Sequence, residues 1–242
     1  LFSDSLLIYG DGELYGLMKK SCEIVVPNTF ETIGALSEGL AIIVKDELLG
    51  FMNAQGEIVI EPMYDLIPNF LARSQFKDGA AVVSKDGMFG IISTKGKEII
   101  PFKYDDLGTW GELIAAKKKG KWGYINRANQ FVIQPFFDFA ETFKGSIGIV
   151  QEVSLSGVIN KKGEKVIETA YNNVELVDEK YLVINNGALY GLYSSNGQSV
   201  LPMIYQSIRV FDENYLILVN SEGISYFNRK NASILKLIET NE

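Results

Sequence analysis

Short apolar runs, bounded by turn residues, recur along the whole chain at nearly even spacing. Residues 41–43 (Ala-Ile-Ile), 81–83 (Ala-Val-Val) and 182–184 (Leu-Val-Ile) are examples. Short apolar runs of this kind are typical of strands buried on both faces. The Asp86-Gly87 and Asn186-Gly187 dipeptides that follow two of them suit the positive φ angles of hairpin turns. The pattern therefore predicts a succession of antiparallel β-hairpins.

A glycine between apolar or aromatic residues marks each unit of this pattern. Six copies are Gly16, Gly50, Gly90, Gly123, Gly157 and Gly191, with spacings of 34, 40, 33, 34 and 34 residues. A seventh, decayed copy places Tyr226 at the glycine position. Glycine inside a strand usually marks a bulge or a close approach by a neighbour. We expect seven repeats, at approximately 1–33, 34–67, 68–107, 108–140, 141–174, 175–208 and 209–242 of a single repeat domain spanning 1–242.

Further positions keep a fixed distance from the glycine. An aromatic residue follows 14 residues later in six copies, namely Phe30, Tyr64, Tyr104, Phe137, Tyr171 and Tyr205. Proline follows 11 or 12 residues later in five copies, namely Pro27, Pro62, Pro101, Pro135 and Pro202. We expect three strands per unit, the third ended or edged by the proline, which cannot donate to a ladder. The segment after the aromatic residue is either a fourth, weak strand or a return loop. Cys22 replaces a turn glycine, which predicts that it lies at a hairpin tip.

The fold class predicted is all-β, with antiparallel β-meander repeats. A seven-bladed β-propeller is favoured, because propellers are built from such sheets. An open β-hairpin solenoid is the alternative, since a repeat of about 34 residues is short beside the roughly 40 or more of a typical blade.

The fourth copy resembles a known repeat family. Its residues 120–126 (Gly-Lys-Trp-Gly-Tyr-Ile-Asn) and 131–135 (Phe-Val-Ile-Gln-Pro) resemble the WG, or KWG, repeat of bacterial proteins. Residues 38–41 and 77–81 resemble the segment that leads into the first strand of that repeat. Tryptophan survives in one copy only, and the fifth copy has Glu168-Thr169 where proline is expected. The resemblance implies a β-rich binding or scaffold module, often exported or in the cell envelope, without shared catalytic residues.

Composition narrows the chemistry. The net charge is −7 and the pI is near 4.9, which disfavours a nucleic-acid partner. The basic cluster of Lys117, Lys118, Lys119 and Lys121 surrounds a turn and is expected to be a solvated hairpin tip. Histidine is absent and Cys22 is the one cysteine, which removes the commonest general base and thiolate zinc sites. We expect no cofactor, no metal and no transmembrane segment, since no window approaches 18 consecutive apolar residues.

A polar residue follows the repeat aromatic in each of the six copies that have one, namely Glu31, Asp65, Asp105, Asp138, Asn172 and Gln206. A ring of carboxylates could bind a hard cation such as calcium. The favoured interpretation is structural: a short acid at a strand start or turn accepts hydrogen bonds from its own backbone.

Two features that depart from the repeat are candidate binding sites. Six extra residues lie within 68–76, and this insertion contains Phe70, Arg73 and Phe76. Insertions in repeat proteins often map to the binding face, and aromatic and Arg residues are enriched at binding hot spots. The alternative is a longer outer strand.

Trp110 is the second candidate. It lies between Gly108 and Gly111 and outside the aromatic register, and it could stack on a sugar or peptide or could cap the core.

The function predicted is a non-enzymatic binding or scaffold module of the bacterial cell envelope, in the periplasm or at the cell surface. Its expected partner is a protein or glycan ligand, and a monomer is the working expectation. No nucleophile elbow and no Gly-rich phosphate loop are present. A carbohydrate-active enzyme on a propeller, with two facing carboxylates outside the repeat, and a purely structural spacer are the alternatives.

Overall fold

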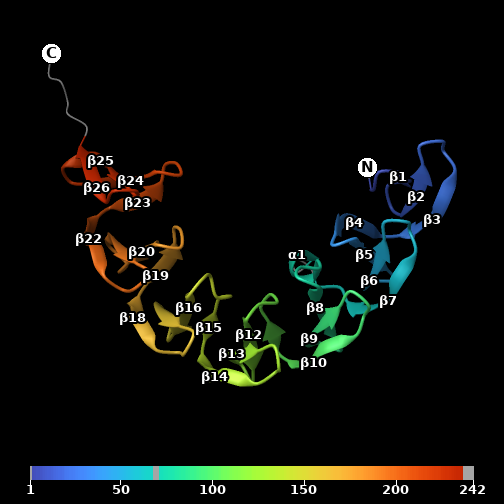
Figure 1. Cartoon of the computed structure of the whole chain (residues 1–242), viewed down its shortest axis with the longest axis horizontal. Coiled ribbons are helices and arrows are strands. Elements are labelled where there is room, and N and C mark those ends of the chain that lie inside the picture. The colour runs from blue at the N-terminus through green and yellow to red at the C-terminus, as the bar shows by residue number, and fades with distance from the viewer. Residues whose placement is uncertain (1, 68–70, 237–242) are drawn as a thin grey trace, which may run out of the picture. The chain divides into compact units, whose positions relative to one another are not determined.

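The chain is built almost wholly of antiparallel β-strands in a computed structural model that describes residues 2–67 and 71–236. These residues form seven sheets, which we name A to G in chain order (Figure 1). Sheets A and C have three strands, and sheets B, D, E, F and G have four. Every pairing described between neighbouring strands is antiparallel. The prediction of an all-β chain of tandem antiparallel repeats is confirmed.

Two compact units divide the chain, Leu1–Pro135 and Phe136–Glu242. Unit 1 contains sheets A, B and C and sheet D up to Pro135. Its strands are, in sheet A, β1 (Leu6–Gly10), β2 (Tyr15–Lys19) and β3 (Ile24–Phe30); in sheet B, β4 (Thr32–Ser37), β5 (Leu40–Lys45), β6 (Leu48–Asn53) and β7 (Ile58–Asp65); in sheet C, β8 (Ala80–Lys85), β9 (Met88–Ser93) and β10 (Glu98–Tyr104); and in sheet D, β11 (Asp106–Leu107), β12 (Leu113–Lys118), β13 (Lys121–Asn126) and β14 (Phe131–Phe137).

Unit 2 contains sheets E, F and G. Its strands are, in sheet E, β15 (Phe139–Ala140), β16 (Ile147–Glu152), β17 (Leu155–Asn160) and β18 (Lys165–Tyr171); in sheet F, β19 (Asn173–Leu176), β20 (Tyr181–Asn185), β21 (Tyr190–Ser194) and β22 (Ser199–Tyr205); and in sheet G, β23 (Ser207–Val210), β24 (Tyr215–Asn220), β25 (Gly223–Asn228) and β26 (Ser233–Lys236). Both units consist of the same repeat. The single domain over 1–242 and its closure into a seven-bladed ring remain predictions.

The four strands of a complete sheet follow one another in the chain and pair in that order, so we call them a, b, c and d. Strand a begins two residues after the repeat aromatic of the preceding sheet, directly after the polar residue that follows it. The segment after the repeat aromatic, predicted to be either a weak strand or a return loop, is therefore a strand in the complete sheets. It begins the next sheet, and in sheets D and E it is only two residues long.

Strand b is the most buried strand of the repeat, as in β5 and β8. In β5, Ile42 and Val44 pack against sheet C, whereas Ala41 and Ile43 pack against sheet A. Side chains alternate between the two faces of a strand, so both faces of strand b are covered by neighbouring sheets. This burial confirms the interpretation of the apolar runs and makes the contact between successive sheets the hydrophobic core of each unit.

The repeat glycine lies where strand d passes close to strand c. A Cβ atom on Gly123 would lie 2.4 Å from the carbonyl oxygen of Ile133 and 2.7 Å from the nitrogen of Pro135. Strand d bulges at this point. In sheet B, Phe51 pairs with Ile60 and Leu49 pairs with Tyr64, so strand d uses more residues than strand c. Both the bulge and the close approach expected at this glycine are confirmed.

Two outcomes were expected at the prolines, a strand that ends or an edge strand, and the structure shows the second. Strand β7 continues through Pro62 to Asp65, and β14 continues through Pro135 to Phe137. Strand d lies at the edge of its sheet, and the proline stands at the bulge, where the ladder is interrupted. A residue without an N–H group is tolerated at both kinds of position.

The seventh repeat is offset by one residue from the alignment that the sequence suggested. Ser225 pairs with Leu218 in sheet G in the way that Gly123 pairs with Ala116 in sheet D. Ser225, and not Tyr226, therefore occupies the glycine position. The error arose because Tyr226 continues the aromatic pattern of the earlier copies.

Turn positions follow the prediction. Asp86 and Gly87 have φ of 53° and 73° in the turn between β8 and β9, and Lys119 has φ of 53° between β12 and β13. Mirror-image hairpin turns require such positive φ angles. Cys22 is exposed, with φ of 65°, in the turn between β2 and β3. The hairpin-tip predictions for Cys22 and for the lysine cluster are confirmed.

The insertion replaces strand a of sheet C. A short helix, α1 (Leu71–Ser74), contacts β8 in sheet C, whereas β8 would pair with a strand a in a complete sheet (Figure 1). The expected longer outer strand is therefore wrong: the added residues include one helical turn beside strand b.

Changing Gly123 to Ala is expected to destabilise the protein by at least about 2 kcal/mol, because the new Cβ would overlap backbone atoms that cannot move without breaking the bulge. Gly34→Ala is the matched control. Its Cβ would meet Ile42 at 3.5 Å or more, an ordinary contact. Urea denaturation measures both, and equal stability of the two variants would contradict the close-approach explanation.

Candidate functional site

One end of sheet D brings together Trp110 and Arg127. Because neighbouring strands are antiparallel, the a–b loop and the c–d turn of a sheet lie at the same end. In sheet D the a–b loop is residues 108–112, and the c–d turn is residues 127–130. We call this end of the sheet, with Trp110, Gly111, Glu112 and Arg127, the sheet-D edge.

Trp110 and Arg127 form a stacked pair at the sheet-D edge. Trp110 is partly buried and packs against the core between sheets C and D. The guanidinium carbon of Arg127 lies 4.9 Å from the centre of the Trp110 ring. Its Nε donates a hydrogen bond of 3.1 Å to the carbonyl oxygen of Gly111. A cation–π contact and a hydrogen bond thus fix the guanidinium plane while the side chain as a whole stays exposed.

An open concavity adjoins this pair. It has a volume of about 470 Å³ and is lined by Glu112, Asn126, Arg127 and Ala128. Within the described part of the chain, the two Nη groups of Arg127 have no hydrogen-bond or ion-pair partner. The sheet-D edge therefore presents a positioned guanidinium, with both Nη groups open to solvent, beside a shallow depression.

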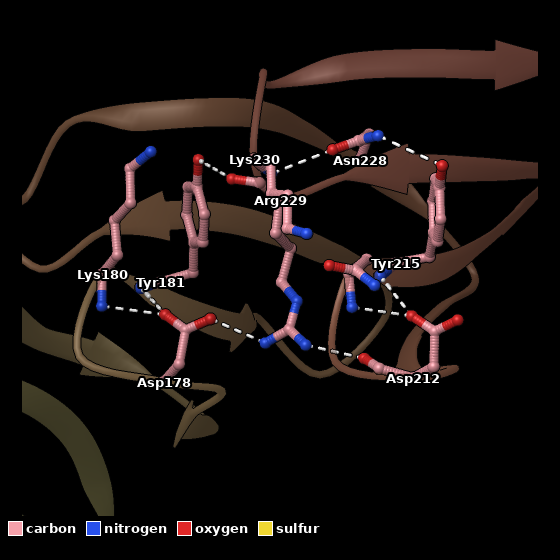
Figure 2. A network of polar contacts seen from close by, with 9 residues as sticks. Asp178, Lys180, Tyr181, Asp212, Tyr215, Asn228, Arg229 and Lys230 are labelled. Carbon is pink, nitrogen blue, oxygen red and sulfur yellow. Dashed lines mark hydrogen bonds and ion pairs between the residues drawn. The ribbon is translucent and has the colours of Figure 1, made fainter.

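Arg229 occupies the same repeat position in sheet G as Arg127 does in sheet D. Each follows the asparagine that ends strand c, Asn228 in one sheet and Asn126 in the other. Figure 2 shows that Arg229 joins two loops. Its Nη2 donates to the carbonyl oxygen of Asp212, in the a–b loop of its own sheet, at 2.6 Å. Its Nη1 meets the Asp178 carboxylate, in the a–b loop of sheet F, at 2.7 Å.

The Asp178 carboxylate is itself positioned by its turn. Its other oxygen accepts hydrogen bonds of 2.8 and 2.9 Å from the backbone N–H groups of Lys180 and Tyr181 (Figure 2). Asp212 stabilises the next loop in the same way, with bonds from Asn214 and Tyr215. The side chain of Arg229 is only 12% exposed, and that of Asp178 is 35% exposed. This network ties sheets F and G together.

Arg73 is engaged in a structural contact. Its guanidinium donates to the carbonyl oxygen of Leu107 at 2.8 Å and to Asp106 at 3.1 Å, which fastens α1 to strand a of sheet D. It also lies 5.9 Å from the centre of the Phe89 ring. A cavity of about 10 Å³, room for one water-sized molecule, lies under α1 beside Arg73. The insertion is thus a brace between sheets C and D.

Phe76 is a core residue. Its side chain is 2% exposed, and its ring centre lies 4.8 Å from that of Phe51. The expectation that Phe76 contacts a ligand is therefore corrected, because a ring enclosed by sheets B and C has no surface to offer. Phe70 lies outside the described residues. Of the predicted binding residues that the structure describes, only Trp110 lies beside an open concavity.

The repeat acids join successive sheets. Asp65 accepts hydrogen bonds from the Ser84 hydroxyl at 2.7 Å and from the Gly87 N–H at 2.9 Å. Asp105 and Asp138 accept comparable bonds from Gly120 and Val153, both at 2.7 Å. Each carboxylate holds the b–c turn of the following sheet. The acid does bond backbone, as favoured, but the backbone of the next hairpin and not its own.

These bonds shift the acid–base equilibrium of Asp65. Burial alone would raise the pKa of this carboxyl, but the hydrogen bonds from Ser84, Gly87 and Asp86 outweigh it and lower the pKa below the ordinary 3.8. The described residues contain no group of three or more potential metal-ligating side chains. Among them there is also no helix long and apolar enough to cross a membrane.

Sequence reasoning found Trp110 and missed Arg127, Asp178 and Arg229. The signal available was the Asn-Arg dipeptide at the same register in two copies, residues 126–127 and 228–229. The one-residue offset in the seventh copy concealed it.

Sheets of three or four strands in tandem, with polar loops gathered at one end of each sheet, define a class of all-β repeat proteins. A family model described as "WG containing repeat" matches residues 15–48, 50–88, 89–122, 122–152, 157–189 and 190–223. The chain therefore belongs to the WG-repeat family, as its fourth copy suggested. None of the curated proteins matches the sequence.

Similar solved structures are propeller-like proteins. The crystal structure of a eukaryotic initiation factor matches with a TM-score of 0.58 and 13% identity, over 98% of this chain and 75% of that one. Hsv2p of Kluyveromyces lactis matches with a TM-score of 0.50 and 12% identity, over 97% of this chain and 95% of that one. At these identities the likeness concerns the fold alone.

Asp65→Asn is expected to lower the free energy of unfolding at neutral pH. It should also make that free energy change less as the pH falls. A carboxyl whose pKa is lowered on folding stabilises the protein above its unfolded pKa, and this contribution is lost as the pH falls through the folded pKa. Urea midpoints of wild type and Asp65→Asn at pH 7 and near pH 3 measure the effect. A stability gap between them that stays constant over this range would contradict it.

Arg229→Ala is expected to destabilise the protein by about 2 kcal/mol, between the values for exposed and for buried ion pairs, because it leaves Asp178 without its cation. Arg127→Ala, at the same register in sheet D, should change stability by less than about 0.5 kcal/mol. Urea denaturation of the two variants tests this difference. Equal losses would show that Arg127 is also a structural brace.

Proposed function

We propose that this WG-repeat chain is a non-enzymatic binding module whose ligand is a protein, bound at the sheet-D edge. The family and the propeller-like structural neighbours fit a binding or scaffold module. The observation that carries the choice of site is the Arg127 guanidinium, held on Trp110 with both Nη groups unsatisfied beside an open concavity. Arginine and tryptophan are the residues most enriched at protein-binding hot spots.

The rest of the repeat supports a rigid frame behind this site. The strands behind the edge are buried on both faces, as β12 is in sheet D. The Arg73 contacts with Asp106 and Leu107 fasten the strand that leads into the Trp110 loop. A guanidinium fixed on a rigid frame loses less conformational entropy on binding than a mobile one.

The absence of catalysis is part of the proposal. It is supported by the use of the repeat acids Asp65, Asp105 and Asp138 as acceptors for backbone N–H groups. Location outside the cytoplasm, in a bacterial cell envelope, is likewise proposed from the family resemblance. A cytoplasmic signal for the native protein in fractionated cells would contradict that location.

Arrays of peptides and of glycans, probed with the labelled full chain, test the ligand class. We expect binding to a subset of peptides and a loss of at least about tenfold in Arg127→Ala, the range for a lost hydrogen bond to a charged group. Arg209→Ala, which removes an exposed arginine of β23, is the matched control and should bind as wild type does.

Other outcomes separate the alternatives. Binding only to glycans, or turnover of them, would favour the carbohydrate-active enzyme or a lectin. No binding to either array would favour the spacer. Peptide binding that survives Arg127→Ala with unchanged affinity would move the site away from the sheet-D edge.

A further inference from the structure

We propose that the sheet-D edge recognises a side-chain carboxylate on a turn of the partner protein, and that Arg127 is the residue that binds it. This inference rests on the proposed function and adds the chemical group that is recognised. The chain itself provides the comparison, because it contains the same arginine twice, once with a carboxylate and once without.

Each arginine donates to a backbone carbonyl of its own sheet, although the two acceptors stand one residue apart in register. Arg127 donates to the carbonyl oxygen of Gly111 at 3.1 Å, and Arg229 donates to that of Asp212 at 2.6 Å. Each acceptor lies in the a–b loop of the arginine's own sheet. The donor atoms differ: Arg127 uses its Nε and keeps both Nη groups, whereas Arg229 uses its Nη2.

The second contact differs between the two sheets. In unit 2 the a–b loop of sheet F supplies Asp178, which meets Arg229 at 2.7 Å. In unit 1 the corresponding loop belongs to sheet C. Asp178 lies three residues before the first paired residue of strand b, Tyr181, and Lys77 lies three residues before Ala80. A lysine therefore stands where the carboxylate would be, and Arg127 has none.

Arg127 is distinguished from the other arginines of the chain. The sequence contains four, and Arg73 and Arg229 each pair with an aspartate. Arg209 is exposed on β23, and no aromatic ring of the described residues stacks on it. Arg127 alone combines a stacked tryptophan, at 4.9 Å, with a concavity and without an internal carboxylate. A planar guanidinium held in this way suits a fork-shaped pair of hydrogen bonds to a carboxylate.

The surroundings favour a protein turn over a polyanion. Glu112 lines the same concavity, and the chain carries a net charge of −7. An acidic polysaccharide would bring many negative charges to an acidic protein, whereas a turn brings one carboxylate with neutral or basic neighbours. The internal example carries a second acid: Asp178 caps its own turn and is followed by Glu179 and then by Lys180, whose charge offsets that of Glu179.

The test uses that internal example as a probe. A cyclic peptide that copies residues 176–182 (Leu-Val-Asp-Glu-Lys-Tyr-Leu) is titrated into the full chain, and the indole N–H signal of Trp110 is followed by NMR. A second peptide carries Asp178→Asn. We expect the first peptide to shift the Trp110 signal and the second to bind at least about tenfold more weakly.

Protein variants complete the experiment. Arg127→Ala should lose the response to the Asp peptide, and Arg127→Lys, which keeps the charge without the planar fork, should lose most of it. Arg209→Ala should respond as wild type does. Equal affinity for the Asp and Asn peptides, an unchanged response in Arg127→Ala, or no response of wild type up to roughly 5 mM peptide, weaker than a millimolar contact, would each overturn carboxylate recognition.

Two results separate this inference from the proposed function. If array peptides bind through Arg127 but the turn peptide does not, carboxylate-turn recognition fails and the protein-binding module stands. If polygalacturonate shifts Trp110 through Arg127 and the turn peptide does not, the partner is an acidic glycan, and both the inference and the protein ligand fail.

Discussion

The passage of strand d over the repeat glycine is the constraint on which the rest of the structure depends. Backbone atoms of strand d come within 2.4 Å of where a Cβ of Gly123 would lie, so only glycine permits the two strands to approach this closely. The bulge formed there returns strand d to pairing at the aromatic residue, as Tyr64 pairs with Leu49 in sheet B. The acid directly after that aromatic then reaches the b–c turn of the next sheet. In sheet B one missing side chain thus helps to set the register within the sheet and toward the next, whereas sheet G, with Ser225 at this position, pairs strands c and d without a bulge.

The sequence predicted those parts of the fold that depend on repetition. Glycine, aromatic and apolar positions recur because each sheet makes the same contacts, and their register alone predicts strands b, c and d. Strand a could not be predicted with the same certainty as the others, because two residues, as in β11 and β15, are too few to show an alternation of polar and apolar positions. The prolines could not distinguish a strand that ends from an edge strand, because a residue without an N–H group is tolerated at both.

The candidate site was less predictable because its members are unremarkable in composition. Trp110 stood out as an aromatic residue outside the register, and it does lie at a loop beside a concavity. Phe76 was also an aromatic residue in a segment that departs from the repeat, yet its side chain is 2% exposed. Enrichment in aromatic residues alone does not distinguish a core from a contact surface. Arg127 gave no signal alone. Arg127 is interpreted by comparison with Arg229, and the equivalence of the two positions depends on the register that Ser225 gives to the last repeat.

Repetition also explains how a binding surface can arise in such a chain without new architecture. In sheet G an arginine and the aspartate of the preceding sheet hold two loops together, and neither is free for a partner. In sheet D the arginine remains, and the preceding loop carries Lys77 instead of an acid. Stability there is supplied by other contacts, including Arg73 with Asp106. Sheet D thus keeps the arginine of this ion pair without the aspartate, and the carboxylate ligand that we propose would take the place of that aspartate.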